Sequence, residues 1–379
     1  MDMVQWARGA FYVASVEVIL TCAGCSGSNG TNGFEPARST TNTTTVPAID
    51  ERTSSAAPRY SPLALPHAFT PVAIMPDGVI AGSEGNQAAQ YSNGRITLLG
   101  HYTGFENNTV ATSVNDRGDA VGYAIAQPYF LGSPTVALFF HLGHLTVLQG
   151  ASSETIDSAT SLNDNNKIVG TCTDPTSENM GFIPNLCTFK LGGIGSVIGS
   201  GTVGNINSRG EYVGSFNDYN NNNMMNLFFA FFGNGVTTTD IFPTRVVGNN
   251  ILQNTASWVN NLGSIVGSTQ QVTTPNTTNA YIIKAGHLSL ITVPRVACTN
   301  ATGINSSNQV VGNAGVSSIA GENDTFTCAG SGFLWESGHL YNLNALVPGS
   351  SLGLNNAIGI DDRGDILASS ANKTYLLRP

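Results

Sequence analysis

One short pattern occurs seven times along the chain, and this repetition restricts the possible folds more than any other feature of the sequence. Most copies have an aliphatic residue at the end of a strand, then Asn or Asp, then Gly or Asn, and finally an aliphatic pair. The copies begin roughly 40 to 56 residues apart, which is typical of β-propeller blades and too long for the coils of a solenoid. They span 73–82, 113–122, 161–170, 205–214, 258–267, 303–312 and 359–368 and are numbered here as repeats one to seven.

The chemistry of each copy predicts a tight β-hairpin. In repeat two, the short side chain of Asn115 can hydrogen-bond to the backbone of the turn. Gly118 then takes a position with positive φ, which Gly adopts without a steric penalty. Asn166 and Asn308 take that position in repeats three and six. The pattern therefore predicts one hairpin turn in each repeat.

A second hairpin follows in most copies, for example within 137–148, 280–290 and 333–343. Two hairpins make a four-stranded antiparallel sheet. The continuous apolar run 227–232 is typical of a strand buried on both faces. Because one such sheet cannot bury its own faces, we expect the sheets to pack around a closed circle. The sequence thus predicts an all-β fold, a seven-bladed β-propeller over residues 59–379.

The two ends of this region predict how the circle closes. Repeat seven has its first hairpin and then a single further strand candidate, 374–377. The segment 59–65, before repeat one, is a strand candidate without a repeat of its own. We expect it to pair with the last blade as its fourth strand, which would remove an exposed sheet edge.

This repeat resembles the HAF family of extracellular repeat proteins of bacteria. The residues closest to the family pattern are 115–122 and 333–335, and the resemblance covers roughly residues 59–379. The sequence departs from the pattern at Met75 and Pro76 and at Ala368, which replaces the final Gly. The resemblance implies an exported, propeller-like protein and does not imply an activity.

The first 25 residues predict an export signal. Arg8 precedes the apolar run 10–20, and the small-residue stretch 21–25 follows. Ala-Gly-Cys at 23–25 is similar to the end of a bacterial lipoprotein box, in which Cys25 would carry the lipid. Cys22 stands where that box usually has Leu, so an ordinary signal peptide is the alternative. Localisation is then the cell envelope, through a lipid anchor, or the extracellular space.

Residues 26–58 are rich in Ser, Thr, Asn, Gly and Pro and predict a disordered tether between this signal and the body. The body contains four cysteines, an even number that indicates disulfides in an oxidising compartment. Three pairings are possible, and we expect the local one. The alternative is four buried free thiols. The expected bridges are Cys172–Cys187 and Cys298–Cys328.

Composition limits the partners. Charged residues make up 10% of the chain, the net charge is −9, and Lys and Arg form no cluster. This excludes a nucleic-acid footprint and argues against electrostatic docking on anionic lipid. We expect a monomer with no cofactor, attached to a membrane through an N-terminal lipid at most.

Variation in loop length predicts a working face. The Asn-containing turns keep their length, whereas the connections between strands two and three and between blades vary. All of these variable connections fall on one face of a propeller, and insertions gathered on one face mark a binding surface. The varying connections include 171–181, 215–226, 268–279 and 313–331. The candidate binding carboxylates on this variable-loop face are Asp174, Glu178, Asp218, Asp240, Glu322 and Asp324.

The sequence therefore favours a non-enzymatic module that binds an extracellular glycan, peptide or protein. The alternative is a polysaccharide hydrolase or lyase that uses paired carboxylates of the same face. A metal site is not expected, because the similar turn residues His144, His287 and His339 belong to separate blades. The polar run 218–222 has oxygen ligands at alternating positions but lacks the Gly and Glu of a calcium-binding loop.

Overall fold

The computed structural model is all-β, with 64% strand and 2% helix over the residues that it describes. The predicted export signal, Cys25 and nearly all of the predicted tether lie outside the residues that it describes. Within the described ranges, no helix has the length and apolar character needed to cross a membrane. Those ranges are 57–103, 108–126, 135–150, 157–172, 185–220, 225–235, 237–242, 246–247, 250–271, 277–293, 296–320 and 325–379.

Each repeat supplies consecutive antiparallel strands. Repeat one contains β2 (Phe69–Ile74), β3 (Ile80–Glu84), β4 (Gln87–Ser92) and β5 (Arg95–Gly100), paired in that order. Repeat two contains β6 (Thr109–Val114), β7 (Ala120–Ile125), β8 (Thr135–His141) and β9 (His144–Val147). Repeats three and four contain β10 (Ser158–Leu162), β11 (Ile168–Cys172), β12 (Asn185–Lys190), β13 (Gly193–Ile206), β14 (Tyr212–Asn220), β15 (Met225–Gly233) and β16 (Thr238–Asp240).

The C-terminal half continues this plan. Repeats five and six contain β17 (Val246–Val247), β18 (Asn250–Val259), β19 (Ile265–Gln271), β20 (Thr277–Lys284), β21 (His287–Ile291), β22 (Cys298–Ile304), β23 (Val310–Ala320), β24 (Thr325–Glu336) and β25 (His339–Asn342). The short helix α1 (Leu343–Leu346) precedes the strands of repeat seven, β26 (Asn356–Ile360), β27 (Ile366–Ser369) and β28 (Thr374–Arg378).

Some neighbouring repeats share one hydrogen-bonded sheet. The first part of β13 pairs with β12, and its second part pairs with β14, so this strand joins repeats three and four. One parallel register contact, Thr278 opposite Cys298, joins β20 of repeat five to β22 of repeat six. Sheets of seven and nine strands result, beside three sheets of four strands.

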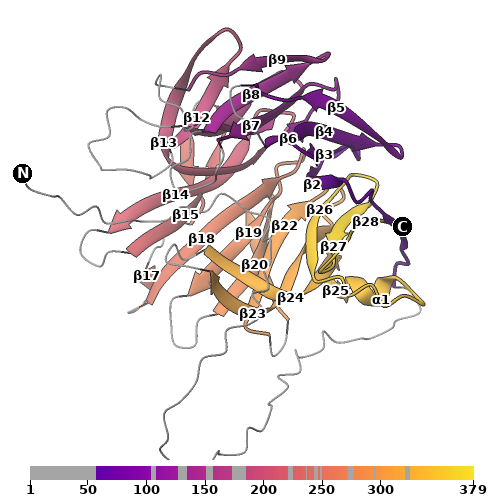
Figure 1. Cartoon of the computed structure of the whole chain (residues 1–379). Coiled ribbons are helices and arrows are strands. Elements are labelled where there is room, and N and C mark those ends of the chain that lie inside the picture. The colour runs from indigo at the N-terminus through magenta and orange to yellow at the C-terminus, as the bar shows by residue number, and fades with distance from the viewer. Residues whose placement is uncertain are drawn as a thin grey trace, which may run out of the picture.

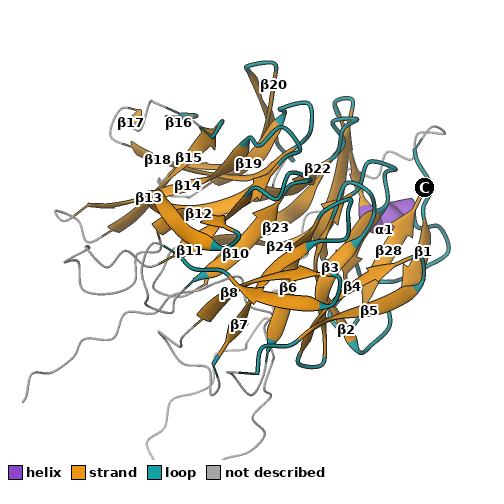
Figure 2. Cartoon of the chain, turned by 90° about the horizontal axis from the view of Figure 1, so that it is seen from above, coloured by secondary structure: helices purple, strands orange, loops and turns teal. Residues whose placement is uncertain are grey.

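The predicted pairing of the N-terminal segment with the last repeat is confirmed. β1 (Ser61–Ala64) is antiparallel to β28, with Ser61 opposite Arg378, and the sheet order is β1-β28-β27-β26. The buried Tyr60 donates its main-chain N–H to the carbonyl of Leu346 in α1 at 2.8 Å. Figure 1 shows the yellow C-terminal strands beside the indigo strand β2, and the views agree that α1 lies next to this sheet (Figure 2).

Apolar side chains on both faces of the sheets hold successive repeats together. On β8, Leu138 packs in a cluster with repeat one, while its neighbour Phe139 packs in a cluster with repeat three. The described residues form seven such clusters, and six of them are each shared by two repeats that follow one another in the chain. The cluster of Phe69 and Leu376 joins repeat one to repeat seven. Alternate residues of one strand therefore belong to different cores.

The Gly that ends the pattern in six of the seven repeats has a packing role. In six repeats the first strand contains a register shift opposite this residue, as between Ala111 and Ser113 on β6. A Cβ added to Gly122 would lie 1.8 Å from the main-chain oxygen of Val110. The absence of a side chain therefore allows the irregular strand to approach β7 closely.

Three of the variable connections are shorter than predicted. β14 and β15 cover most of 215–226, β19 and β20 cover most of 268–279, and β23 and β24 cover most of 313–331. The sequence suggested loops because these segments are rich in Ser, Thr and Asn. Main-chain pairing does not require apolar side chains, however, and the hairpins continue through them.

The local disulfide pairing is confirmed, and the alternative of four free thiols is wrong. Cys172 and Cys187 form one bridge with a Cα–Cα distance of 5.9 Å. Cys298 and Cys328 form the other, with a Cα–Cα distance of 5.4 Å. Two disulfides are consistent with an exported protein, since such bridges persist in oxidising compartments.

Candidate functional site

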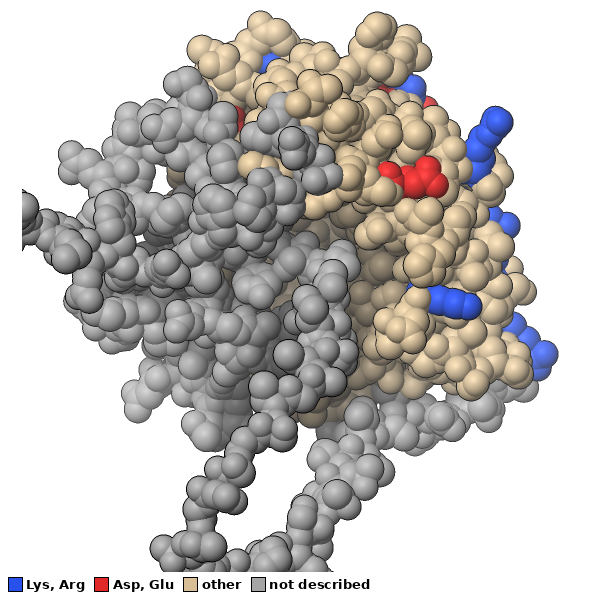
Figure 3. Space-filling model, viewed as in Figure 1, with Lys and Arg blue, Asp and Glu red and all other residues tan. Residues whose placement is uncertain are grey.

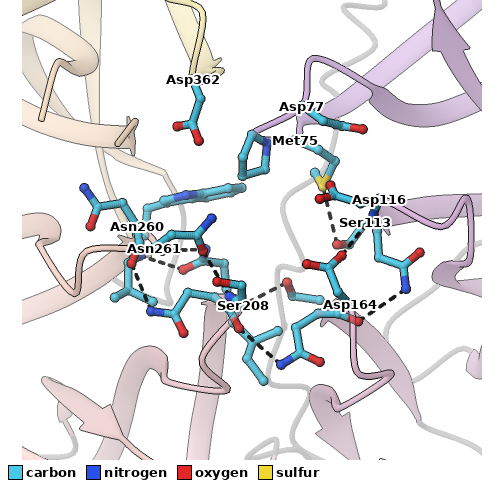
Figure 4. Close-up of a pocket in the computed structure, with 18 of the residues that line it drawn as sticks. Met75, Asp77, Ser113, Asp116, Asp164, Ser208, Asn260, Asn261 and Asp362 are labelled. Atoms are coloured by element: carbon cyan, nitrogen blue, oxygen red, sulfur yellow. Dashed lines mark hydrogen bonds between the residues drawn. The ribbon is translucent and has the colours of Figure 1, made fainter. Parts of the chain in front are cut away.

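The first hairpin turns of the seven repeats surround one cavity of about 290 Å³ (Figure 4). Residues from every repeat line it, so the cavity exists through the arrangement of all seven. Polar side chains from the start of each turn form part of its lining. One such residue from each repeat is Asp77, Asp116, Asp164, Ser208, Asn261, Ser306 and Asp362.

The repeated Asn stabilises its own turn, as the sequence predicted. Asn115 Oδ1 accepts the main-chain N–H groups of Arg117 at 3.0 Å and Asp119 at 2.9 Å. The predicted positive φ is also confirmed, at 80° for Gly118 and 54° for Asn166. The same pair of Oδ1 contacts occurs at Asn163, Asn207, Asn260 and Asn305.

The same amides also connect one repeat to the next. Asn207 Nδ2 donates to the main-chain carbonyl of Asn260, the equivalent residue of repeat five, at 2.9 Å. This bond recurs from repeat two to repeat seven with lengths of 2.8–3.3 Å. In repeat seven, the N–H of Asp362 donates to the carbonyl of Pro76 in repeat one at 2.9 Å. A buried asparagine thus serves both the turn and the contact between turns, which explains why its position is so constant along this chain.

Repeat seven differs because Asp361 replaces the asparagine. Its Oδ1 accepts two N–H groups, at 3.0 Å from Arg363 and 2.7 Å from Asp365. Its Oδ2 is buried without a hydrogen-bond partner and lies beside Gly78 of repeat one, where an asparagine would place its Nδ2 donor. Burial raises the pKa of Asp361 to about 6, and the charge of Asp365 also raises it, while the two N–H contacts lower it.

Four carboxylates gather on one side of the cavity. Figure 4 shows Asp362, Asp77, Asp116 and Asp164 on consecutive parts of the rim, with Ser208 and Asn261 on the other side. These acids come from repeats seven, one, two and three. Burial raises the pKa of the Asp116 carboxyl, and the negative charges of the other three acids raise it further. The other three carboxylates therefore disfavour the charged form of Asp116.

Two basic side chains of the same turns form ion pairs with acids outside the lining. Arg209 donates to Glu211 Oε2 at 3.0 and 2.6 Å, and Arg117 lies 3.5 Å from Asp119. None of the described residues that line the cavity is Lys, Arg or His. Charged side chains are also few and scattered on the described part of the face in Figure 3. The acidic side of the cavity is therefore an exception to a weakly charged surface.

An aromatic side chain lies deeper in the cavity. Trp258, at the end of β18, is half-buried and lines the cavity. It packs against the core between repeats five and six and also against the core between repeats one and two. The indole therefore extends across the middle of the molecule and forms part of the inner lining.

Two of the carboxylates predicted for the variable-loop face, Asp218 and Asp240, lie in the described part of the chain. Asp174, Glu178, Glu322 and Asp324 lie outside the described residues. Asp218 is in β14, opposite Leu227, and Asp240 ends β16, where its Oδ1 accepts the N–H of Phe242 at 3.1 Å. Sequence reasoning missed the cavity, although the signal existed: the residue after the constant Asn varies among Asp, Ser and Asn.

The described residues include no group of three or more His, Cys, Asp or Glu side chains that could hold a metal ion. His144, His287 and His339 are exposed first residues of β9, β21 and β25, which belong to three different repeats. The residues that line the cavity thus offer carboxylates, hydroxyls and an indole for direct contact with a ligand.

Comparisons with known proteins do not identify a family. No family model matches the sequence, and no curated protein matches it. Among solved structures, acylaminoacyl peptidase from Pyrococcus horikoshii resembles the fold with a TM-score of 0.43 and 13% identity, over 74% of this chain and 46% of that chain. The match spans less than half of the peptidase, and a likeness this distant carries no functional argument.

Proposed function

We propose that this chain is an exported, seven-bladed β-propeller of HAF-like repeats that acts as a non-enzymatic binding module. Seven cores between successive repeats, including one between repeats seven and one, support a closed circle. The turn-to-turn hydrogen bonds from repeat two to repeat seven, and from repeat seven to repeat one, support it independently.

The observation that carries the binding function is the cavity to which every repeat contributes. The turns share one backbone design, yet the side chains after the constant Asn differ between repeats. A constant scaffold with unlike side chains around a concavity is typical of a ligand site. The variable-loop face, with the carboxylates named above, is the second place where a ligand could bind.

A binding screen with two variants separates these sites. The full chain is tested against glycan and peptide arrays, together with Ser208→Phe and with a variant whose 313–331 hairpin is shortened. Ser208 is exposed, and its main-chain N–H makes the contact with Asn261, so a large side chain can obstruct the cavity without removing that bond. We expect Ser208→Phe to abolish binding and the hairpin variant to retain it.

The opposite pattern, with binding lost in the hairpin variant alone, would place the ligand on the variable-loop face. If no glycan, peptide or polyamine binds, or if neither variant changes the binding of those that do, the proposal that the cavity is a binding site is wrong. Circular dichroism and thermal unfolding of each variant show whether the fold is retained.

One observation favours a second function, a polysaccharide hydrolase or lyase. The Asp116 carboxyl has a raised pKa beside Asp164, whose Oδ1 accepts the main-chain N–H of Asp116 at 3.0 Å. A carboxylic acid with a raised pKa next to a carboxylate is the pairing that glycoside cleavage uses. Release of reducing or unsaturated ends from a polysaccharide panel, lost in Asp116→Asn, would establish the enzyme. Absence of release by the native chain would exclude it for those substrates.

The cellular location follows from the same proposal. The two disulfides support export, and Cys25 is the proposed lipid attachment site. Fractionation of cells that express the full chain, with and without Cys25→Ala, tests both. We expect the native protein in the envelope fraction and the variant in the medium or periplasm. Recovery of both in the cytoplasm with reduced cysteines would contradict export.

A further inference from the structure

The hydrogen-bonding groups of the cavity are unequally available to a ligand. The amides of the constant asparagines are used within and between the turns, as described above. Asn205, deeper in the cavity, is used in the same way: its Oδ1 accepts the N–H of Val259 at 2.7 Å and its Nδ2 donates to the carbonyl of Val259 at 3.1 Å. Ser306 Oγ donates to Asp362 Oδ2 at 2.8 Å. Most side-chain donors of the lining are therefore satisfied by the protein itself.

The lining also holds four charged acceptors, of which Asp77, Asp164 and Asp362 already accept hydrogen bonds from the protein. Each carboxylate has about four lone-pair sites and can therefore accept further bonds. Asp116 and Asp362 are exposed at the rim, and Asp77 and Asp164 are half-buried. All four have carboxylate oxygens on the same side of the cavity, and no basic side chain of the described lining neutralises them. Asp164 Oδ1 accepts the main-chain N–H of Asp116 at 3.0 Å, so these two acids are neighbours, and all four line one cavity of about 290 Å³. Their negative charges therefore repel one another. A positive group placed between them would relieve this repulsion.

The remaining apolar surface suits a cation of a particular kind. The half-buried indole of Trp258 and the buried side chain of Met75 form part of the inner lining. An apolar lining suits the alkyl stem of an organic cation, whereas a metal ion requires several ligands at short distance from one point. The described chain has no cluster of side chains that could provide such a metal site.

From these three features together, we infer that the cavity binds an organic cation, a ligand that carries an ammonium or guanidinium group. The charged head lies among the four carboxylates, and the alkyl stem extends toward Trp258. A cavity of about 290 Å³ accommodates a chain of the width of a lysine side chain. Such a group belongs either to a basic peptide or to a free polyamine. This inference rests on the proposed binding function of the cavity and specifies its ligand.

Isothermal titration calorimetry of the full chain tests it. Tetralysine represents the basic peptide, spermidine the free polyamine, and tetra-N-acetyl-lysine and a neutral oligosaccharide are the uncharged controls. We expect tetralysine or spermidine to bind, with quenching of tryptophan fluorescence. Affinity should decrease as salt is raised to about 0.5 M, because screening weakens exposed charge pairs. Whichever cationic probe binds more tightly identifies the source.

The matched variants are Asp116→Asn/Asp164→Asn and Glu84→Gln/Glu336→Gln. Both remove two negative charges, but the second pair lies outside the described lining. The amide oxygen at 164 can still accept the N–H of residue 116, and that at 336 can still accept from Gln309 Nε2. We expect roughly a tenfold or greater loss of affinity for the cation in the first variant and less than about threefold in the second.

The inference is wrong if neither cationic probe binds, if the acetylated peptide binds as well as tetralysine, or if both double variants lose affinity equally. These outcomes differ from failure of the proposed function. A neutral or anionic ligand whose binding is abolished by Ser208→Phe would leave the cavity as a binding site and exclude the cation. If Ser208→Phe leaves binding of every ligand unchanged, both the proposed site and the cation inference are wrong.

Discussion

The replacement of Asp361 by Asn is the sharpest test of the contacts between the turns. The carboxyl at 361 stands where the other five turns of this type have an asparagine, and its Oδ2 is buried without a partner. An asparagine would offer Nδ2 to the main chain of repeat one, as the equivalent residues do toward their neighbours. We therefore expect Asp361→Asn to stabilise the protein at neutral pH.

The size of this stabilisation follows from the pKa of Asp361. Its rise from 3.8 to about 6 corresponds to a free-energy difference of at most about 3 kcal/mol between the charged and the protonated form. Relaxation around the charge reduces this, and a new hydrogen bond adds about 1 kcal/mol. We expect Asp361→Asn to raise the free energy of unfolding by about 1–3 kcal/mol at pH 7.5.

The pH dependence has a definite sign. The folded protein holds the Asp361 proton more tightly than the unfolded chain, so the native protein loses stability as pH rises from about 4 to about 6. The benefit of Asp361→Asn should be small at pH 4, where the protonated acid can also donate, and complete above about pH 6.5. Asp365 also has a pKa raised by burial and faces the same region, so Asp365→Asn is measured in parallel.

Urea unfolding followed by tryptophan fluorescence at pH 4.5 and 7.5 provides the measurement. Asn305→Asp is the reciprocal variant, since it introduces the same acid into repeat six, and we expect it to destabilise the protein at pH 7.5. A loss of stability in Asp361→Asn at pH 7.5, or an equal gain at both pH values, would refute the reasoning.

Three further substitutions test other features of the fold by the same unfolding measurement. Asn207→Ala removes two turn contacts and the bond to the next repeat. It should lower the free energy of unfolding by about 2–4 kcal/mol. A loss below about 0.5 kcal/mol would contradict the role of these amides. The double replacement of Cys172 and Cys187 by Ser should lower it by about 3 kcal/mol under non-reducing conditions, and an unchanged midpoint would show that the bridge does not restrict the unfolded chain. Gly122→Ala should destabilise the protein by more than about 2 kcal/mol, because its Cβ would meet a main-chain oxygen, whereas Ala368→Gly at the equivalent position should change stability by less than about 1 kcal/mol.

The local chemistry of the turns could be predicted because it depends on a few adjacent residues. The Asn that accepts N–H groups two and four positions later, and the residue with positive φ after it, are both readable in one copy of the repeat. The pairing of β1 with β28 was also predictable, since repeat seven lacked one strand and one strand candidate remained.

The cavity could not be predicted in the same way. It depends on how seven turns from distant parts of the chain face one another, and no single copy contains that information. Each asparagine bonds to its own turn and to the next repeat. The second bond, such as that from Asn115 to Asn163, forms only when the next repeat is in position. The packing role of Gly122 likewise depends on an irregular partner strand. The long hairpins of repeats four to six were not predicted, because main-chain pairing does not require the strands to carry apolar side chains.

The pairing of β1 with β28 determines when this sheet can form during synthesis of the chain. The strand of the body that leaves the ribosome first must wait for the one that leaves last, so this sheet cannot form before translation has passed Arg378. Until then β1 and β27 each keep an unpaired edge. A polypeptide terminated before Thr374 would retain both, and could satisfy them by exchanging strands with another copy.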